Sequence, residues 1–154
     1  GPEGAGLSIF NHSMEWERSF IFASHVGSMA RQLDEAVAHA RGRRQFGQPI
    51  GRFQSVSNRI ADMRLRLETC RLLLHKAAWM MDRGEDTKLI PALAKLQIGE
   101  SFPPSSIEAM RVHGGRGYMP AHGVERDLRD AAGGVIYSGT SDIQRQLIAK
   151  LLGL

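Results

Sequence analysis

The apolar residues of this chain recur at steps of three and four positions, which is the spacing of one face of an α-helix. Across positions 23–40 the repeat has no gap: Ala23, Val26, Ala30, Leu33, Val37 and Ala40. Ser13 is a suitable N-cap for this stretch, and Glu15 and Glu17 would then lie in the first turn, where the helix dipole favours negative charge. We therefore predict one long helix that begins near Ser13 and ends at the basic run 41–44.

The second stretch of regular spacing is longer. Its apolar positions step by four and three, and they are Val56, Ile60, Met63, Leu67, Cys70, Leu74, Ala77 and Met81. A seam of this kind packs nearly parallel to a neighbouring helix, as in helix bundles. We predict a helix over this stretch that ends at Arg83 and Gly84.

A third helix should begin between Thr87 and Pro91, because a proline is tolerated in a first turn. Pro103 and Pro104 follow farther along the same segment. Each proline removes an amide donor and clashes with the preceding turn. We therefore predict a kink or break there, with helix resuming at residue 105 or 106 and ending at 112.

Two shorter helices complete the pattern. We expect one over residues 124–131 and the last over about 140–152. The sequence contains no alternating run typical of a strand and no internal repeat. The predicted fold class is therefore all-α, an up-down four-helix bundle with extra short helices toward the C-terminus.

Composition narrows the class of protein. With 154 residues the chain fits one domain and is long enough to bury a core. Hydrophobic residues make up 42%, but no apolar run approaches the ~20 residues of a membrane span. The net charge of +4 suits anionic partners, while the scattered basic residues do not indicate nucleic acid. We expect a protein with no membrane span and no nucleic-acid partner.

Cysteine and histidine set two further expectations. Cys70, the single cysteine, excludes an intrachain disulfide, and its apolar register indicates a buried thiol in a reducing compartment. We accordingly expect a cytoplasmic location. The six histidines show no ligand spacing with cysteines or acids, apart from Glu35 and His39 one turn apart, which usually form a surface pair. We expect no metal site.

Four separate motifs occur along the chain. They are residues 43–50 (RRQFGQPI), Phe53-Gln54 with Ala61-Asp62-Met63, residues 114–118 (GGRGY), and residues 125–130 (ERDLRD) leading into 138–141 (SGTS). Together they resemble the C-terminal helical domain of the acyl-CoA dehydrogenase family, and the resemblance covers about residues 3–154. Family members carry an N-terminal helical domain and a middle β-domain before this point, and both are absent from these residues. The resemblance implies that residues 1–154 form one C-terminal helical domain.

The same resemblance implies FAD as the cofactor. It places Arg43 against the cofactor's pyrophosphate across a subunit boundary, a contact that suits a permanently charged guanidinium. Gln45, Phe46 and Gln54 should lie nearby. A contact across a subunit boundary also implies a homodimer or homotetramer. Without the resemblance, Arg43 would be interpreted as a solvated charge at a helix C-terminus.

Two more groups of residues are assigned to the cofactor by the resemblance. Gly114 and Gly115 resemble glycines that let a backbone approach the adenosine half closely, although a plain helix C-cap would look the same. Arg111 stands where the family commonly has a glutamine that contacts the cofactor. At the start of the last helix, side chains and free amides suit an anion or a polar cofactor group and are equally compatible with N-capping. These residues are Thr140, Ser141 and Asp142.

The last motif departs from the family at Ser138. Most members have a glutamate there, and its carboxylate removes the α-proton of the thioester. Serine lacks that proton affinity, although its backbone N–H could still hydrogen-bond the thioester carbonyl. In a minority branch that includes the isovaleryl-CoA dehydrogenases, the base comes from the first helix, directly before an arginine. Glu17, before Arg18, resembles that base, and Arg18 with Glu15 resembles a salt-bridged pair near the pantetheine-phosphate end.

The resemblance therefore implies an FAD-dependent dehydrogenase that oxidises an acyl thioester of CoA or of a carrier protein and passes electrons to a flavoprotein acceptor. Catalysis requires Glu17 to face the loop that carries Ser138, and the domain alone is expected to be inactive. Three alternatives stay open. Glu17 could simply serve the helix dipole. The departures at Ser138 and Arg111 favour a catalytically silent member that acts as a structural partner subunit, and a free-standing binding module would require a gene that encodes these residues alone.

Overall fold

The computed structural model describes residues 1–85 and 88–154. Within them the helices are α1 (Gly6–Phe20), α2 (Ala23–Gly42), α3 (Gln54–Asp82), α4 (Leu89–His113), α5 (Gly115–Tyr118), α6 (Val124–Gly133) and α7 (Ser141–Leu151). Between them lie the short 3₁₀ helices η1 (Ile50–Arg52) and η2 (Pro120–His122) and an antiparallel hairpin of β1 (Arg44–Gln45) and β2 (Gln48–Pro49). The prediction of an all-α bundle is confirmed.

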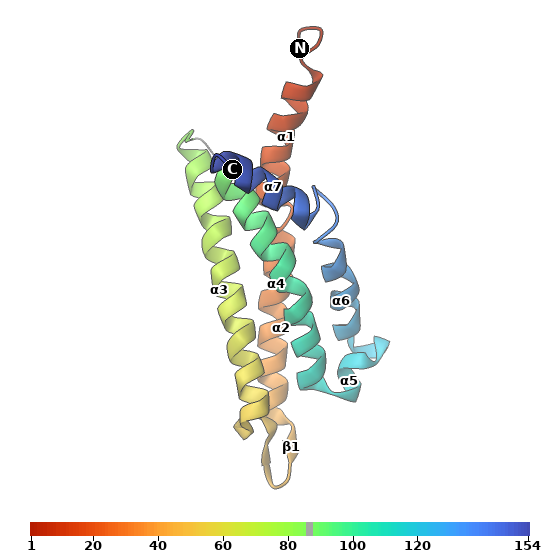
Figure 1. The fold of residues 1–154 in the computed structure, drawn as a ribbon. Helices are drawn as coiled ribbons and strands as arrows, with labels where there is room; N and C mark the ends of the chain where they lie inside the picture. Colours follow the sequence, from red (N-terminus) through yellow and green to blue (C-terminus); the bar gives the residue numbers. More distant parts are fainter. Residues whose placement is uncertain (86–87) are drawn as a thin grey trace.

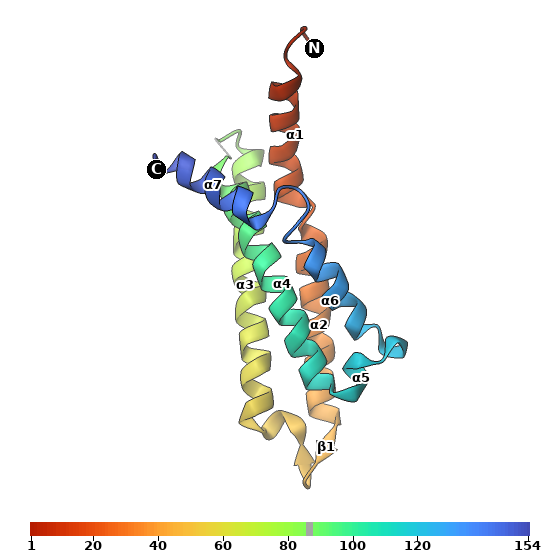
Figure 2. The ribbon, with the colours of Figure 1, turned by 45° about the vertical axis from the view of Figure 1, so that its right-hand side comes forward.

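Helix α4 lies at the centre of the bundle and packs against α1, α2, α3, α6 and α7. Figures 1 and 2 show α2, α3 and α4 side by side, with α1 projecting beyond one end and the hairpin closing the other. The core between these helices consists of buried apolar side chains, including Phe22, Met29, Leu67, Ile98 and Phe102. Of the helices in the described ranges, none combines the length and the apolar character that crossing a bilayer requires.

The prediction of one long helix from Ser13 is wrong in two respects. The stretch folds as two helices that are interrupted at 21–22, and α1 begins at Gly6. Phe22 has no exposed surface, so its packing in the core determines where α1 and α2 are joined. No side chain caps the start of α1, where Ala5 is the preceding residue. A local N-cap preference therefore did not decide where the helix starts.

The prolines of α4 do not break the helix. It is continuous over Leu89–His113 and contains both Pro103 and Pro104. A proline inside a helix costs about 3 kcal/mol or more, because a backbone hydrogen bond is lost. Phe102, next to the prolines, is 1% exposed and belongs to the buried core of the bundle. Tertiary burial thus outweighs the local preference. Thr87, the first residue of the predicted start, lies outside the described residues.

The other helices agree with their predictions. Helix α3 covers the regular seam, of which Met63, Leu67, Cys70, Leu74 and Ala77 are buried. Helices α6 and α7 begin at or next to their predicted first residues. The hairpin was not predicted, because strands of two residues are too short for alternation to appear. Phe46 and Gly47 form its turn with φ values of 51° and 80°.

Candidate functional site

Two distant parts of the chain meet at one contact. The hydroxyl of Ser138 donates a hydrogen bond to Oε1 of Glu17 at 2.6 Å, across 121 positions of sequence. Glu17 lies on α1, and Ser138 lies between α6 and α7. Glu17 is exposed and Ser138 is half-buried. The structure therefore brings together the two residues whose proximity the resemblance requires.

The position of Glu17 within α1 argues against a role in stabilising the helix through its dipole. Helix α1 ends at Phe20, so Glu17 lies in the last turn, where the dipole disfavours a negative charge. The first turn of α1 contains no acidic residue. The interpretation of Glu17 as an acid that stabilises a helix start is therefore wrong.

Ser138 adopts a backbone conformation that is uncommon for a residue with a β-carbon. Its φ is 57°, and the φ of Gly139 is 85°. The left-handed region costs a non-glycine residue roughly 1–2 kcal/mol, and such strain is often found at functional sites. The amide of Ser141 donates to the carbonyl of Val135 at 3.1 Å and closes the loop. The turn thus presents the Ser138 hydroxyl to α1.

The two predicted substrate-binding residues, Glu15 and Arg18, line one hollow of about 320 Å³. Its other lining residues are Asn11, Lys88, Leu147 and Lys150. Nε of Arg18 is buried and makes no hydrogen bond within the part of the chain that the structure describes. Three of the lining side chains are cationic and one is acidic. The hollow therefore favours an anionic group.

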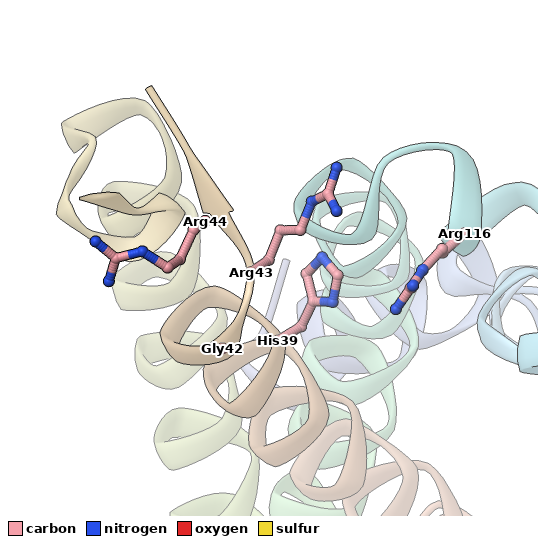
Figure 3. Close-up of a pocket in the computed structure, with 5 residues that line it drawn as sticks. All are labelled: His39, Gly42, Arg43, Arg44 and Arg116. Atoms are coloured by element: carbon pink, nitrogen blue, oxygen red, sulfur yellow. The ribbon is translucent and has the colours of Figure 1, made fainter. Parts of the chain in front are cut away.

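A second, strongly basic hollow lies where α2 meets the hairpin. Its volume is about 520 Å³, and its lining residues are His39, Gly42, Arg43, Arg44 and Arg116. Figure 3 shows Arg43, His39 and Arg116 around one shared space, whereas Arg44 extends to the other side. Nη2 of Arg44 donates to the carbonyl of Gly47 at 2.7 Å. Because none of the lining residues is acidic, the hollow suits a ligand that carries phosphate.

Two imidazoles lie together at this hollow. The rings of His39 and His113 are 4.6 Å apart between centroids, and Nδ1 of His113 is 2.8 Å from the carbonyl oxygen of Ala109. Burial lowers the pKa of His39 from its ordinary value, and the charges of His113, Arg116 and Arg43 lower it further. These groups concentrate positive potential at one point. A bound anion would relieve the repulsion among them.

The other predicted cofactor residues at this end are mostly accessible. Gln45 and Phe46 lie on the hairpin, and Phe46 is 91% exposed. Gln54 opens α3 and is exposed. Arg111, in the last turn of α4, is already engaged in an ion pair with Glu108 at 2.8 Å. Their roles toward a cofactor stay predictions.

Gly114 lies between α4 and α5, and Gly115 is the first residue of α5. Gly114 has a φ of 61°, which glycine adopts without steric penalty. A β-carbon at either position would meet no neighbouring atom within 4 Å. The close approach that the resemblance implies for these glycines is therefore not made within the described chain. It would have to be made to another molecule.

The third predicted cofactor group opens α7. Oγ1 of Thr140 accepts a hydrogen bond from the amide of Ile143 at 3.3 Å, so its N-cap role is confirmed. Ser141 is 7% exposed, and its hydroxyl is buried with no hydrogen-bond partner among the described residues. Asp142 is exposed and forms an ion pair with Arg145 at 3.1 Å. A cofactor contact at these positions stays a prediction.

The predicted cofactor residues thus form two groups at different levels along α4. Figure 1 shows the hairpin at one end of the bundle and α7 crossing α4 toward the other. Arg145 of α7 pairs with Glu100 of α4, whereas His39 of the basic hollow lies against His113 at the end of α4. These two positions of α4 are about 13 residues, or about 20 Å, apart. The two groups therefore do not form one compact site within a single chain.

Sequence analysis missed two residues of the basic hollow. Arg116 lies within the GGRGY motif, where its position between glycines was a usable signal. His39 lies one helical turn before Arg43, and nothing else in the sequence marks it. In residues 1–85 and 88–154, no group of three or more His, Cys, Asp or Glu side chains is arranged to hold a metal ion.

Comparison with known proteins gives consistent results. Residues 4–153 match the family described as Acyl-CoA dehydrogenase, C-terminal domain. L-prolyl-[peptidyl-carrier protein] dehydrogenase of Pseudomonas fluorescens is 53% identical over 154 residues, which cover 100% of this chain and 40% of the relative. Caffeyl-CoA reductase-Etf complex subunit CarC of Acetobacterium woodii is 34% identical over 152 residues, which cover 99% of this chain and 40% of that protein.

Solved structures show the same relationship. Prolyl acyl carrier protein oxidase AnaB is similar with a TM-score of 0.98 and 50% identity, covering 100% of this chain and 41% of that one. PigA with FAD and proline is similar with a TM-score of 0.98 and 45% identity, covering 100% and 40%. The chain therefore spans about two fifths of the length of these proteins. It belongs to the acyl-CoA dehydrogenase family and corresponds to the C-terminal domain of that family.

Proposed function

We propose that this chain is the C-terminal domain of an FAD-dependent dehydrogenase that oxidises the α,β-bond of an acyl thioester, with the N-terminal helical and middle β-domains preceding it. The observation that carries the proposal is the hydrogen bond between Glu17 and Ser138. It sets a carboxylate against the loop position where most of the family has its glutamate. The acid that this loop lacks is thus supplied from α1.

Glu17 is the proposed general base. Its carboxylate takes the α-proton, the electrons of that C–H bond form the double bond, and a hydride leaves the β-carbon. When bound, FAD supplies the acceptor for that hydride. A carboxylate suits the first task once substrate and protein exclude water from it, because desolvation raises its proton affinity.

Ser138 contributes two groups to this arrangement. Its backbone N–H is proposed to donate to the thioester carbonyl, where negative charge develops as the α-proton leaves. Its hydroxyl orients the Glu17 carboxylate through the 2.6 Å hydrogen bond. Arg18 and Glu15 are proposed to position the phosphate-bearing arm of the substrate, and the cationic excess of their hollow supports this role.

The residues proposed to hold FAD fit an anionic cofactor. Arg43 and Arg116 supply guanidinium groups in the basic hollow, and His39 lies between them. This group and the residues that open α7 lie beside positions of α4 about 13 residues apart, so their contacts to one cofactor are proposed to come from different copies of the chain. This supports a homodimer or homotetramer in which each site is completed by a neighbouring subunit.

The relatives favour a finer substrate class. The 53% identity to an L-prolyl-[peptidyl-carrier protein] dehydrogenase supports a prolyl thioester on a carrier protein. The similarity to a subunit of a complex named for Etf supports a flavoprotein electron acceptor. A cytoplasmic location stays a prediction.

The proposal is tested in the full-length protein that carries this chain. Glu17→Gln keeps the shape of the side chain and removes the base, so flavin absorbance at saturating L-prolyl carrier-protein thioester should bleach at least 100-fold more slowly. The matched control is Glu68→Gln, a partly exposed acid on α3 that pairs with Arg64 at 3.0 Å. Normal bleaching in Glu17→Gln would contradict the proposal.

A catalytically silent partner subunit is not favoured. The similar proteins described above include a dehydrogenase, an oxidase and a reductase-complex subunit by name. The same bleaching assay on the unchanged protein decides the matter, because a silent subunit would leave flavin absorbance unaltered.

A further inference from the structure

The segment between α6 and α7, residues 134–140, carries Ser138 and has no regular secondary structure; we call it the serine loop. A loop that presents a reacting group must be held by the protein around it, and its buried backbone groups need partners. Side chains from α4 and α7 supply such partners, and a side chain from α2 bonds the hydroxyl of Tyr137. None of these side chains has a part in the chemistry proposed above.

The first contact holds the start of the loop. Lys95 on α4 has no exposed surface, and its Nζ donates to the carbonyl of Gly134 at 3.0 Å. Burial lowers the pKa of Lys95 from its ordinary value, while Glu100 opposes and Arg18 adds to that effect. A buried ammonium is unfavourable unless it is hydrogen-bonded, so its contact with the loop is a specific one. Helix α4 also comes close, since a β-carbon at Gly99 would lie 2.8 Å from the Gly134 oxygen.

The second contact holds the end of the loop. Gln144 on α7 has no exposed surface, and its Nε2 donates to the carbonyl of Gly139 at 3.2 Å and more weakly to that of Ser138 at 3.4 Å. A β-carbon at Gly139 would lie 2.7 Å from this Nε2. Glycine is therefore needed there for the approach as well as for its φ of 85°. The two bonds hold the peptide groups on both sides of Gly139, directly after Ser138.

A third contact comes from α2. The hydroxyl of Tyr137, the residue before Ser138, lies 2.5 Å from Nε2 of His25, and its ring stacks on Phe22 at 5.6 Å. Burial lowers the pKa of His25 and raises the pKa of Tyr137. Both shifts favour a neutral imidazole that accepts a hydrogen bond from the phenol. The residues on both sides of Ser138 are therefore held from the interior.

We infer that Gln144 and Lys95 are positioning residues whose buried donors hold the two ends of the serine loop and keep Ser138 in the conformation that meets Glu17. The catalytic consequence rests on the proposed function of Glu17, whereas the hold on the loop is a property of this chain. A displacement of about 1 Å in a reacting group can lower a rate by roughly 100-fold. Loss of either donor therefore affects the chemical step more than it affects binding.

The test compares Gln144→Met and Lys95→Met with a matched control, all in the full-length FAD-bound protein. Methionine keeps the length of each side chain and lacks the donor. The control is Gln32→Met. Gln32 is 1% exposed and donates to Ser106 at 2.8 Å and to Asp127 at 3.1 Å, so it is a buried glutamine whose bonds lie elsewhere.

Two measurements follow. Hydrogen exchange of the amides of residues 135–141 should be about 10-fold faster in Gln144→Met and Lys95→Met than in the unchanged protein, and unaltered in Gln32→Met. Single-turnover flavin reduction by an L-prolyl carrier-protein thioester should have a limiting rate about 10-fold lower in the two loop variants. The thioester concentration at half-saturation should stay within about 3-fold. A general loss of stability would instead affect Gln32→Met as well.

The inference would be overturned if hydrogen exchange of the loop amides is unchanged in Gln144→Met and Lys95→Met. It would also be overturned if this exchange is faster to the same degree in Gln32→Met. Faster exchange with an unchanged limiting rate of flavin reduction would overturn it too. The catalytic position of Ser138 would then not depend on the contacts made by Gln144 and Lys95. If the unchanged protein is not reduced by any acyl thioester, the proposed function fails, and hydrogen exchange alone decides whether the loop is held. If Gln144→Met does not fold, Gln144→Leu makes the same comparison, because leucine is a smaller apolar side chain that cannot donate.

Discussion

Ser138 reaches Glu17 from a backbone with a φ of 57°, so this hydrogen bond is made by a residue held in the left-handed region. That region is unfavourable for serine by roughly 1–2 kcal/mol and open to glycine. The strain is compensated by the 2.6 Å bond and by the contacts that hold the loop. A side chain with a β-carbon is kept at this position although glycine would fit the backbone better.

Two substitutions separate the strain from the hydrogen bond. Ser138→Ala and Ser138→Gly both remove the hydroxyl, but only glycine relieves the backbone. We predict that the glycine variant is more stable than the alanine variant by about 1 kcal/mol in urea denaturation of this chain. Equal stability would show that the left-handed conformation is not strained in solution.

The same pair of variants tests the hydroxyl in the reaction. In the full-length protein, both should lower the rate of flavin reduction by roughly 10-fold, because a hydrogen bond to a charged group is lost and Glu17 is less well oriented. Flavin content should be unaltered. An unchanged rate in both variants would leave the backbone N–H as the sole contribution of Ser138.

The basic hollow predicts a specific effect on cofactor affinity. Arg116→Met removes one of the guanidinium groups that face the shared space with Arg43, so the Kd for FAD should rise about 10-fold in fluorescence titrations of the apo full-length protein. Arg83→Met is the matched control, because Arg83 pairs with Glu85 at 2.9 Å outside the hollow. Equal effects of the two substitutions would contradict a role for Arg116.

Stability should fall in mild acid because of His25. Burial lowers its pKa from the ordinary histidine value of 6.5, so the unfolded chain binds more protons than the folded chain between the two pKa values. The free energy of unfolding should therefore decrease as pH falls through 6.5, by at most about 1.4 kcal/mol for each pH unit crossed, and level off below the folded pKa.

The check is urea denaturation of this chain between pH 7.5 and 5. Combining His25→Phe with Tyr137→Phe removes the titrating group together with the hydroxyl that bonds it, and should flatten the pH dependence. His122→Gln, at an exposed position, should leave the dependence as it was. A steep dependence that persists in the double variant would assign it to other groups, of which His39 is the next candidate.

Much of the fold could be predicted from local spacing. The regular apolar spacing over α3 predicted both the helix and its buried face. Residues three and four apart share a helical face whatever the helix packs against. Thr140 marked the start of α7 for a similar reason, since an N-cap bonds its own helix. The four motifs gave the family. The break between α1 and α2 and the continuity of α4 could not be predicted, because burial of Phe22 and Phe102 outweighed local preferences.

The candidate site, too, could be predicted from the sequence only in part. The sequence by itself supplied the residue types, a loop that lacks the usual glutamate and an acid beside an arginine. Tertiary structure decided that Glu17 lies in the last turn of α1 and meets Ser138, and that Arg116 and His39 join Arg43. Helical periodicity relates residues within one or two turns, whereas contacts between distant segments depend on how whole helices pack. That packing is a property of the assembled core and not of any single segment.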